Sequence, residues 1–507
     1  MSPEELARTR LKPRRMGIDS HSQPVVFLRA DCHVCRSEGL EAQTQVTVTI
    51  GDKSVVATLN IVYSDILDPG EVGLSEAAWR RLEIDDGELA VLSHTPALDS
   101  MSHVRSKLYG HRLSRQAMHE IITDVVAGHY GDIHLAALLT ACSGNRLDLS
   151  EITWLTESMV GAGRRIDWGR EQVMDKHCLG GLPGNRTTPI VVSIAAACGL
   201  LIPKTSSRAI TSPAGTADTM ETMTRVTLGL EDMRRVVEKE NGCLVWGGSV
   251  SLSPADDILI RVERALDIDS EGQMVASVLS KKIAAGSTHV LIDIPVGPTA
   301  KVRGRQAAEH LAHILKETGK ALGIQVRTVQ SDGTQPIGFG IGPALEAVDV
   351  LAVLRHESGA PADLRERALM VAGELLEIGG KAAHGKGQKL ARETLTSGRA
   401  WQKFLAICEA QGGFHEPVIA GHTRVITAQR NGIVTHINNR VISRLAKLAG
   451  APGAPGAGVR IAVQLGDRVE SGQPLFELFA DSPGELAYAL EFHEAHPDMI
   501  RVEEESA

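Results

Sequence analysis

The stretch THVLIDIPVGPTAKVRGRQAAEHLAHILKETGKALGIQVRTVQSDG (288–333) decides the fold class. It opens with a short apolar run that ends at Gly297, continues as a strongly amphipathic helical pattern over 303–323, and closes with a second strand-like run over 324–333. Strand–helix–strand spacing of this kind predicts a right-handed crossover within a mostly parallel or mixed sheet. We therefore expect an α/β domain over residues 176–420.

The segments before and after this domain have other periods. Short runs rich in Val, Thr and Ile, such as TQVTVTIG (44–51), predict a small β-rich domain over 1–97. Apolar residues then recur every three or four positions, as in LSRQAMHEIITDVVAG (113–128) with Ser114 as the expected N-cap. This predicts a helical domain over 98–175, completed by part of 213–253. Strand-like runs return in a C-terminal β-rich domain over 421–507. The whole is a multi-domain α/β (α+β) protein.

Composition excludes several classes of function. The formal charge is 53 − 62 = −9 with no long basic run, which argues against binding to duplex nucleic acid. Aromatic residues make up only 3%, which argues against base-stacking platforms. The longest nearly apolar run, between Pro189 and Pro203, is too short to span a membrane, which needs about 20 residues. We expect neither nucleic acid nor membrane as a partner.

The cysteines indicate the compartment. Seven cysteines, an odd number, in a long chain with a good core favour a reducing cytoplasm. Cys32 and Cys35 form one C-x-x-C pair, and a zinc or redox site would need a second pair or a thioredoxin-like context. Neither is present, so we interpret both as ordinary cysteines.

The stretch DKHCLGGLPGNRTTP (175–189) is the first candidate site. It places three Gly within five positions beside a Lys, an Arg and two Thr. A Gly-rich loop that leads into a helix offers unpaired backbone N–H groups and the positive end of the helix dipole, which suits a phosphate. The order of a Walker A motif is absent. The glycines alone fit a simple tight turn equally well.

The stretch KTSSRAITSPAGTADT (204–219) is the second candidate site and favours the phosphate interpretation. Its hydroxyl residues surround one guanidinium and can bind several oxygens of a phosphate or ribose. A Ser/Thr-rich surface loop would instead have more Asp, Glu and Lys. Two donor-rich segments in one chain usually converge on one site.

Several long motifs resemble the thymidine phosphorylase (pyrimidine-nucleoside phosphorylase) family, and most closely its AMP phosphorylase branch. They are KHCLGG (176–181), SSRAITSPAGTADTME (206–221), ASVLSKK (276–282), SDGTQPIG (331–338) and GPALEA (342–347). The resemblance covers nearly the whole chain. It implies a pentosyltransferase that cleaves an N-glycosidic bond with inorganic phosphate, giving a free base and a pentose 1-phosphate. We expect the helical domain to face the α/β domain across a cleft whose closure excludes water.

The resemblance also implies site residues. The phosphate-binding positions match Lys176, Thr187, Ser206 and Thr216. In the AMP phosphorylase branch, the positions that line the nucleotide site match Gly181, Ser207, Arg208, Ala209, Ile210, Thr211, Ser212 and Thr216, with further contacts at Ser277 and Lys301. Ser277 and Lys281 also match base-contacting positions of pyrimidine nucleoside phosphorylases.

Two residues are candidates for the catalytic acid. The leaving base needs a proton or a strong hydrogen bond as negative charge develops on it. Asp269, in RALDIDS (264–270), matches the proton donor of the AMP phosphorylase branch, although by residue type alone it is more simply a helix N-cap. A carboxyl donates near neutral pH only if burial or neighbouring anions raise its pKa. His177 is the rival acid, with an ordinary pKa of about 6.5.

One residue departs from the family pattern. The family has Ser where this chain has Cys178, and a thiol is a weaker donor than a hydroxyl. We expect a weakened phosphate contact rather than its loss. Cys178 is also the one feature that suggests a non-catalytic nucleotide-binding regulator.

Two phosphorolysis reactions remain open. One is cleavage of a nucleoside 5′-monophosphate to ribose 1,5-bisphosphate and free base. The other is cleavage of thymidine to 2-deoxyribose 1-phosphate and thymine. They differ by the 5′-phosphate, for which Arg208 and Lys301 are the candidate cations. Inorganic phosphate is a co-substrate, and we expect no metal or other cofactor. By resemblance, the chain forms a homodimer through the helical domain or a larger homo-oligomer.

Overall fold

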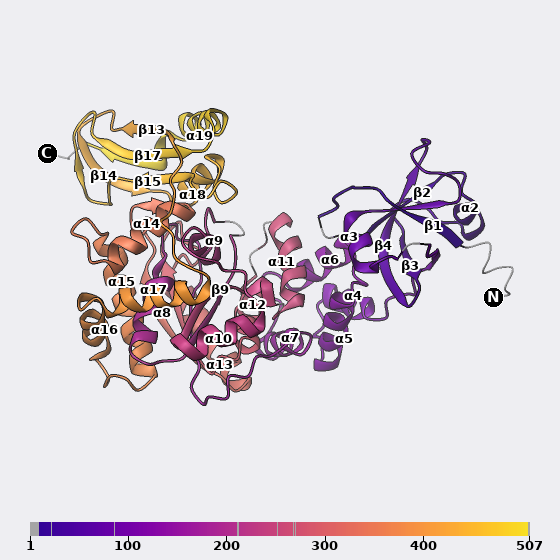
Figure 1. Cartoon of the computed structure of the whole chain (residues 1–507), viewed down its shortest axis with the longest axis horizontal. Coiled ribbons are helices and arrows are strands. Elements are labelled where there is room, and N and C mark those ends of the chain that lie inside the picture. Colours follow the sequence, from indigo (N-terminus) through magenta and orange to yellow (C-terminus); the bar gives the residue numbers. More distant parts are fainter. Residues whose placement is uncertain are drawn as a thin grey trace. The chain divides into compact units, whose positions relative to one another are not determined.

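The computed structural model (Figure 1) describes residues 10–21, 23–85, 87–209, 212–250, 252–266, 268 and 270–504. The chain forms two compact units, one of Met1–Ser158 with Ala255–Ser270 and one of Met159–Pro254 with Glu271–Ala507. The segment that returns to the helical domain from later in the chain is Ala255–Ser270. The sequence analysis expected part of 213–253 in that place. One contact within the first unit is the ion pair between Arg261, on this segment, and Asp132 at 2.6 Å.

The first unit begins with a closed barrel. Its strands follow the order β1 (Arg10–Arg15), β5 (Glu71–Leu74), β2 (Val25–Arg29), β4 (Lys53–Val62), β3 (Gln45–Ile50) and β6 (Ala90–His94). Helices α2 (His33–Glu38) and α3 (Glu76–Leu82) lie between strands. The charged sequence RLKPRR of β1 lacks the apolar alternation of a typical strand, because only Leu11 is buried in the core. It is a strand because it pairs with β5. Cys32 and Cys35 are free thiols packed in the barrel core.

Helices complete the first unit. They are α4 (Met101–Leu108), α5 (Arg115–Val126), α6 (Asp132–Cys142), α7 (Leu149–Gly161), whose last turn lies in the second unit, and α11 (Pro254–Leu266). The predicted N-cap of α5 is confirmed, since Ser114 Oγ accepts a hydrogen bond from the backbone N–H of Ala117 at 3.1 Å. The buried residues of α5 recur at three- and four-residue spacing, which places its apolar face in the core.

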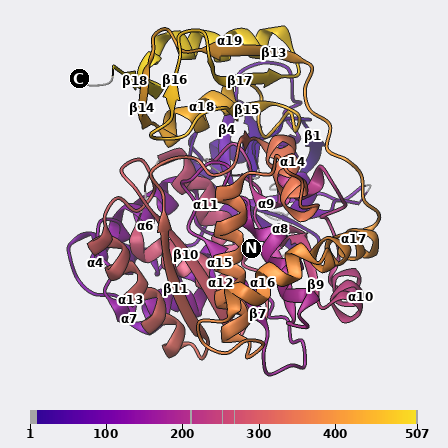
Figure 2. The same cartoon turned by 90° about the vertical axis from the view of Figure 1, so that its left-hand side faces the viewer.

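The second unit contains the predicted parallel strands, which can be followed in Figure 2. The central sheet has the order β11 (Gln325–Asp332), β10 (His289–Val296), β7 (Met174–Cys178), and both pairs are parallel. Helix α13 (Arg305–Ala321) is the crossover from β10 to β11. The strand–helix–strand prediction for 288–333 is therefore confirmed. A second parallel sheet joins β8 (Ile202–Ser206) to β9 (Gly242–Trp246), which is followed by the short helix η1 (Gly247–Val250).

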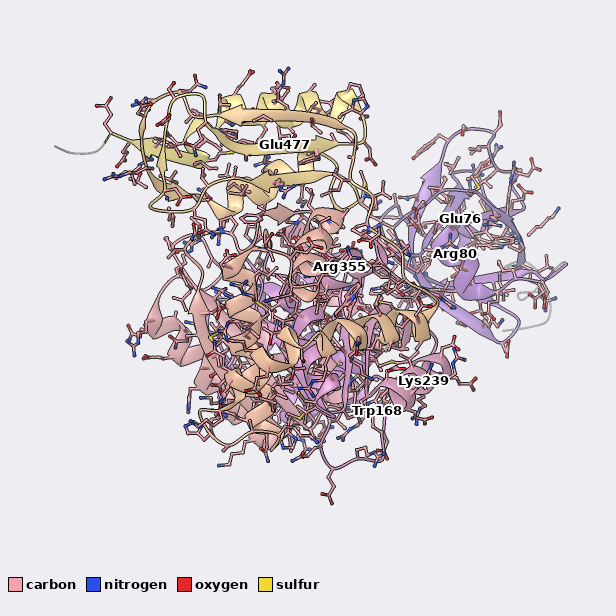
Figure 3. The ribbon with its side chains drawn as sticks, turned by 60° about the vertical axis from the view of Figure 1, so that its left-hand side comes forward. Glu76, Arg80, Trp168, Lys239, Arg355 and Glu477 are labelled. Carbon is pink, nitrogen blue, oxygen red and sulfur yellow. The ribbon has the colours of Figure 1, made fainter. Side chains whose placement is uncertain are left out.

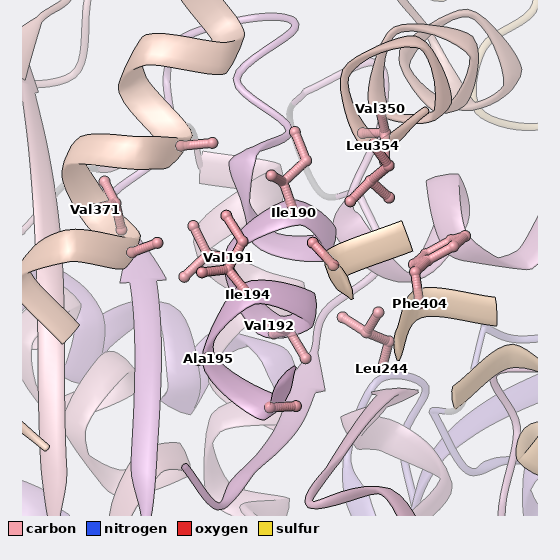
Figure 4. Close-up of a cluster of buried hydrophobic side chains, with 14 of the residues drawn as sticks. Ile190, Val191, Val192, Ile194, Ala195, Leu244, Val350, Leu354, Val371 and Phe404 are labelled. Atoms are coloured by element: carbon pink, nitrogen blue, oxygen red, sulfur yellow. The ribbon is translucent and has the colours of Figure 1, made fainter. Parts of the chain in front are cut away.

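Helices supply the largest core of this unit (Figure 4). Helix α8 (Thr187–Ala197) is buried along almost its whole length, because apolar residues such as Ile190 and Ile194 cover every face of it. Phe404 and Val371 pack in the same cluster. The other helices are α9 (Thr216–Glu221), α10 (Leu230–Glu240), α12 (Glu271–Ala284), α14 (Pro343–Leu354), α15 (Ala362–Ile378), α16 (Gly387–Thr396) and α17 (Arg399–Gln411).

The C-terminal part of the second unit is β-rich, as its sequence predicts. One sheet has the order β12 (Gly340–Ile341), β15 (Gly458–Ile461), β17 (Pro474–Ala480), β13 (His422–Thr427), and the other has β16 (Arg468–Val469), β14 (Gly432–Ile437), β18 (Ile500–Glu503). Helices α18 (Asn439–Leu448), α19 (Pro483–Ala495) and η2 (Pro497–Met499) accompany them. Because β12 immediately precedes α14, its pairing with β15 ties this part to the α/β core. Within the described ranges, no helix is both long and apolar enough to cross a bilayer.

Candidate active site

The predicted phosphate-binding residues lie on two strands and at the first residues of the helices that follow them. Lys176 is on β7 and Thr187 is the first residue of α8, while Ser206 ends β8 and Thr216 is the first residue of α9. Ligands of α/β proteins bind at the carboxyl ends of parallel strands, where such loops begin. The two candidate blocks of the sequence analysis, 175–189 and 204–219, contain the connections from β7 to α8 and from β8 to α9.

Lys176 is fully buried and its Nζ donates to the hydroxyl groups of two threonines. The distances are 2.7 Å to Thr187 Oγ1 and 3.2 Å to Thr188 Oγ1. Burial lowers the pKa of this lysine, and the nearby thiol of Cys178 and the carboxylate of Asp293 partly oppose that effect. The structure therefore brings two predicted phosphate ligands, Lys176 and Thr187, into direct contact.

Arg186 joins the two blocks. Its Nη1 donates to Thr216 Oγ1 at 2.8 Å and its Nη2 to the carbonyl oxygen of Ala214 at 2.9 Å. Its Nε donates to the carboxylate of Glu346, on α14, at 2.6 Å. The sequence analysis noted this arginine within the first block but assigned it no role, because the partner carboxylate lies 160 residues away.

Ser206 has the environment of a ligand-binding hydroxyl. Its Oγ is buried and, among the described residues, has no hydrogen-bond partner. A buried hydroxyl without a partner costs stability unless a ligand or water satisfies it. The loop that follows turns back on α9, because the backbone N–H of Ala217 donates to the Ser207 carbonyl oxygen at 3.4 Å.

Asp218 accepts hydrogen bonds from backbone groups at and next to the predicted nucleotide-lining residues. Asp218 Oδ2 accepts from the backbone N–H groups of Ala209 at 2.6 Å and Gly215 at 2.8 Å. Arg208 contacts Asp218 at 3.2 Å and Glu221 at 2.5 Å, and these hydrogen bonds and charges raise its pKa. The Arg208 guanidinium also lies 4.9 Å from the ring centroid of Trp246.

The remaining predicted residues of this stretch bond within it, are exposed, or lie outside the described residues. Ser212 Oγ donates to the carbonyl oxygen of Ala214 at 3.0 Å, and Ser207 is exposed. Ile210 and Thr211 lie outside the described residues. Asp269, the predicted acid, also lies outside them, so its role stays a prediction.

A buried carboxylate organises the other side of β7. Asp175 contacts Lys204, on β8, at 3.0 Å and Lys282, on α12, at 2.8 Å. Burial disfavours the charged carboxylate, but the charges of the two lysines outweigh it and lower the pKa of Asp175. The sequence analysis assigned no role to these residues. Charged residues within buried strands are the signal that could have found Asp175 and Lys204, whereas Lys282 is on a helix.

His177 follows this carboxylate along the chain and lies in a cationic environment. Its pKa is well below the ordinary value because burial and the charges of Lys282, Lys204 and Lys281 all disfavour protonation. A neutral imidazole can donate a hydrogen bond from its N–H but is not a cationic acid near neutral pH. This environment argues against His177 as a cationic acid.

Cys178 has one close polar partner. Asn185 Nδ2 donates to its Sγ at 3.0 Å, while Asn185 Oδ1 is buried without a partner among the described residues. Burial raises the pKa of the Cys178 thiol to about 12, and Asp293 adds to this effect. The thiol is therefore protonated at neutral pH and is a poor nucleophile.

Gly181 brings a third loop to the site. Its φ is +78°, and a Cβ at this position would lie 2.8 Å from the backbone nitrogen of Lys301, in the loop after β10. Only Gly allows this close approach. Two further predicted contacts, Ser277 and Lys281, are half-buried on α12, and the charge of Lys281 acts on His177.

Comparisons with known proteins identify the family of the chain. Residues 170–401 match the glycosyl transferase family, a/b domain, and residues 102–163 match its helical bundle domain. The chain is 62% identical over 493 residues to the "Putative thymidine phosphorylase" of Hahella chejuensis, covering 97% of this chain and 98% of the relative. It is 60% identical over 498 residues to "Putative thymidine phosphorylase 1" of an Acidovorax species, covering 98% of each.

A solved structure shares the fold. The anthranilate phosphoribosyltransferase of Thermus thermophilus superposes with a TM-score of 0.51 at 20% identity, covering 61% of this chain and 98% of that chain. The helical bundle and the α/β domain are those of the glycosyl transferase family. The chain is therefore an enzyme, a pentosyltransferase, and belongs to the thymidine phosphorylase (pyrimidine-nucleoside phosphorylase) family.

Proposed function

We propose that this enzyme cleaves the N-glycosidic bond of a nucleoside 5′-monophosphate with inorganic phosphate. A phosphate oxygen forms a bond to C1′ of the ribose, and the bond from C1′ to the base nitrogen breaks. The electron pair of that bond leaves with the base, which takes a proton. The products are ribose 1,5-bisphosphate and the free base, so atoms and charge balance without an oxidant or a reductant.

The single observation that carries the proposal is the group of hydrogen-bond donors at and after β7 and β8, which we propose binds phosphate. The Lys176 side-chain nitrogen donates a hydrogen bond to the hydroxyl of Thr187, and the Arg186 guanidinium donates one to the hydroxyl of Thr216. The Ser206 hydroxyl is buried and has no partner within the described part of the chain. Charge-assisted hydrogen bonds of this kind hold a phosphate in line with the C1′ carbon and raise the rate by orientation.

A protonated leaving base requires an acid. In this proposal, Asp269 donates the proton, because His177 is held neutral by burial and four neighbouring lysines. Lys281 and Ser277, from α12, contact the base.

The 5′-phosphate of the substrate needs a cation of its own. Lys301 is the proposed contact, because its backbone nitrogen lies 2.8 Å from where a Cβ at Gly181, in the loop after β7, would be. Arg208 is shared between the carboxylates of Asp218 and Glu221, so it acts mainly by tying the segment just after β8 to α9. We propose further that the enzyme acts in the cytoplasm as a homodimer or larger homo-oligomer.

Thymidine phosphorolysis is the second candidate. The observation that favours it is the name that the two relatives above carry, "Putative thymidine phosphorylase", at about 60% identity over nearly their whole length. In that case thymidine and phosphate give 2-deoxyribose 1-phosphate and thymine.

A substrate panel separates these possibilities. The purified enzyme is incubated with nucleosides and nucleoside 5′-monophosphates, with and without phosphate, and free base is measured by chromatography. We expect phosphate-dependent base release from at least one monophosphate, with ribose 1,5-bisphosphate visible by ³¹P NMR. Release from thymidine alone would select the second candidate. Nucleotide binding without any base release would contradict both and support a non-catalytic regulator.

A further inference from the structure

We propose that Arg186 is a positioning residue of the phosphate site, which acts by fixing the direction of the Thr216 hydroxyl. The inference rests on the proposed phosphorolysis and identifies a residue that sets the affinity for phosphate. It assigns a role to a cation whose side chain links the loop after β7 to the residues just before and at the start of α9.

The guanidinium of Arg186 is held on three sides. Nε contacts the Glu346 carboxylate at 2.6 Å, Nη2 the Ala214 carbonyl oxygen at 2.9 Å, and Nη1 the Thr216 hydroxyl at 2.8 Å. The planar fork of an arginine fixes the angles between these contacts, which a lysine could not do. The position of Nη1 relative to Thr216 is therefore set by two contacts on the other side of the guanidinium.

Glu346 is the anchor of this arrangement. It is 1% exposed and, besides Arg186, accepts from the Thr219 hydroxyl and the Gly342 backbone N–H, each at 3.4 Å. Burial raises the pKa of the Glu346 carboxyl, and the charge and hydrogen bond of Arg186 oppose that rise. Because the guanidinium is already paired with this carboxyl through Nε, its contribution to phosphate binding is geometric, unlike that of a free cation.

The geometry decides which way the Thr216 hydroxyl donates. A guanidinium only donates hydrogen bonds, so Thr216 Oγ1 must accept from Nη1. Its own proton must then point elsewhere, and the part of the chain that the structure describes holds no other partner for it. The three unprotonated oxygens of a phosphate dianion only accept hydrogen bonds, so a hydroxyl that is already oriented as a donor binds one of them without first turning.

A second threonine hydroxyl at the site also accepts a hydrogen bond from a basic side chain. Lys176 Nζ, another group that only donates when charged, contacts Thr187 Oγ1 at 2.7 Å. Both threonines that match phosphate-binding positions therefore accept a hydrogen bond from a buried or half-buried basic side chain. The two cations come from the same block, at positions 176 and 186, and α8 begins immediately after Arg186.

The test is a double-mutant cycle between Arg186 and Thr216. The variants are Arg186→Met, Thr216→Val and the double variant, with kcat and the KM values for phosphate and nucleotide measured for each. We expect each single variant to raise the phosphate KM about 10- to 100-fold, as for loss of a hydrogen bond to a charged group. The nucleotide KM should change by less than about threefold. The double variant should resemble the single ones, because both remove the same oriented donor.

A matched control removes a different arginine. Arg355, labelled in Figure 3, contacts Glu416 and lies 4.8 Å from the ring centroid of Trp401, and neither of these partners belongs to a candidate block. Arg355→Met should leave the phosphate KM unchanged. Arg186→Lys replaces Arg186→Met in the cycle if the methionine variant does not fold, and it should rescue little because it lacks the fork.

The outcomes separate this inference from the proposed function. Absence of phosphate-dependent base release by the unaltered enzyme would contradict the function, and phosphate binding measured by calorimetry on the same variants would then test the inference alone. Two results would overturn the inference while the function stood. One is a phosphate KM of the double variant that rises by the product of the two single-variant increases, and the other is an unchanged phosphate KM and affinity in Arg186→Met.

Discussion

The Nζ of Lys176 lies 2.7 Å from the Oγ1 of Thr187, and the lysine side chain is completely buried. The two residues belong to different elements, since Lys176 is inside β7 and Thr187 begins α8. A buried ammonium group is costly unless it is well hydrogen-bonded, and Thr188 supplies a second contact at 3.2 Å. The contact thus links the strand to the first turn of the helix and places a positive charge where the proposed phosphate binds.

Lys176→Ala tests the role of this charge. We expect the phosphate KM to rise strongly or activity to be lost, because a charge-assisted contact to a dianion disappears. Lys239→Ala is the matched control, because Lys239 is an exposed lysine of α10 (Figure 3). Steady-state kinetics with varied phosphate measures both. Unchanged phosphate kinetics in Lys176→Ala would remove the first block from the phosphate site.

Cys178→Ser tests the residue that departs from the family pattern. The serine hydroxyl can still accept from Asn185 and can also donate to phosphate. We expect the phosphate KM to stay equal or fall, by no more than the roughly 0.5–1.5 kcal/mol of one hydrogen bond. The nucleotide KM should not change. A marked loss of phosphate affinity would mean that the site is built around the thiol.

Asp269→Asn tests the predicted acid. The amide keeps the shape of the side chain but has no acidic proton, so kcat should fall roughly 10²- to 10⁴-fold with substrate binding nearly retained. Rapid-quench or steady-state assays measure kcat. A kcat within about threefold of the unaltered enzyme, far below that range, would leave Asp269 as a helix cap and direct attention to His177.

The depressed pKa of His177 predicts a dependence of stability on pH. The ordinary pKa of an unfolded histidine is about 6.5, whereas in the fold the imidazole stays neutral to lower pH. Below pH 6.5 the unfolded chain therefore binds more protons, so the folded state loses stability as the pH falls towards the pKa of the folded state. The contribution is at most about 1.4 kcal/mol per pH unit.

Chemical denaturation at pH 8 and pH 5.5 measures this effect. The unaltered enzyme should lose more stability between these values than His177→Gln, which has no titrating ring. Equal pH dependence in the two proteins would show that His177 titrates normally in the fold.

Asp175→Asn tests the buried carboxylate. Removing its charge leaves Lys204 and Lys282 buried without a counter-ion, a change that costs about 3–5 kcal/mol in buried ion pairs. Thermal unfolding should show a large loss of stability. The control is Asp232→Asn, whose partially exposed carboxylate contacts Arg235 at 2.9 Å and should contribute less than about 1 kcal/mol. Similar melting of Asp175→Asn and Asp232→Asn would contradict the buried role.

The sequence alone predicted those features that depend on neighbouring residues. The strand–helix–strand period of 288–333 and the N-cap of Ser114 are encoded within a few turns of chain, and the structure has both. The two candidate blocks were found for the same reason, because glycines and hydroxyl residues are dense there. The family motifs added the assignment of Lys176, Thr187, Ser206 and Thr216, and the first two are in contact.

Only the tertiary structure decided which distant residues become partners. The RLKPRR segment is a strand because β5 pairs with it, although its own pattern does not predict one. Arg186 meets Glu346 across 160 residues, and Asp175 meets both Lys204 and Lys282. The physical reason is that local sequence sets backbone period and capping, whereas an ion pair depends on which strands and helices become neighbours when the cores close. The direction in which the Thr216 hydroxyl donates, and the neutral state of His177, therefore exist only in the folded chain.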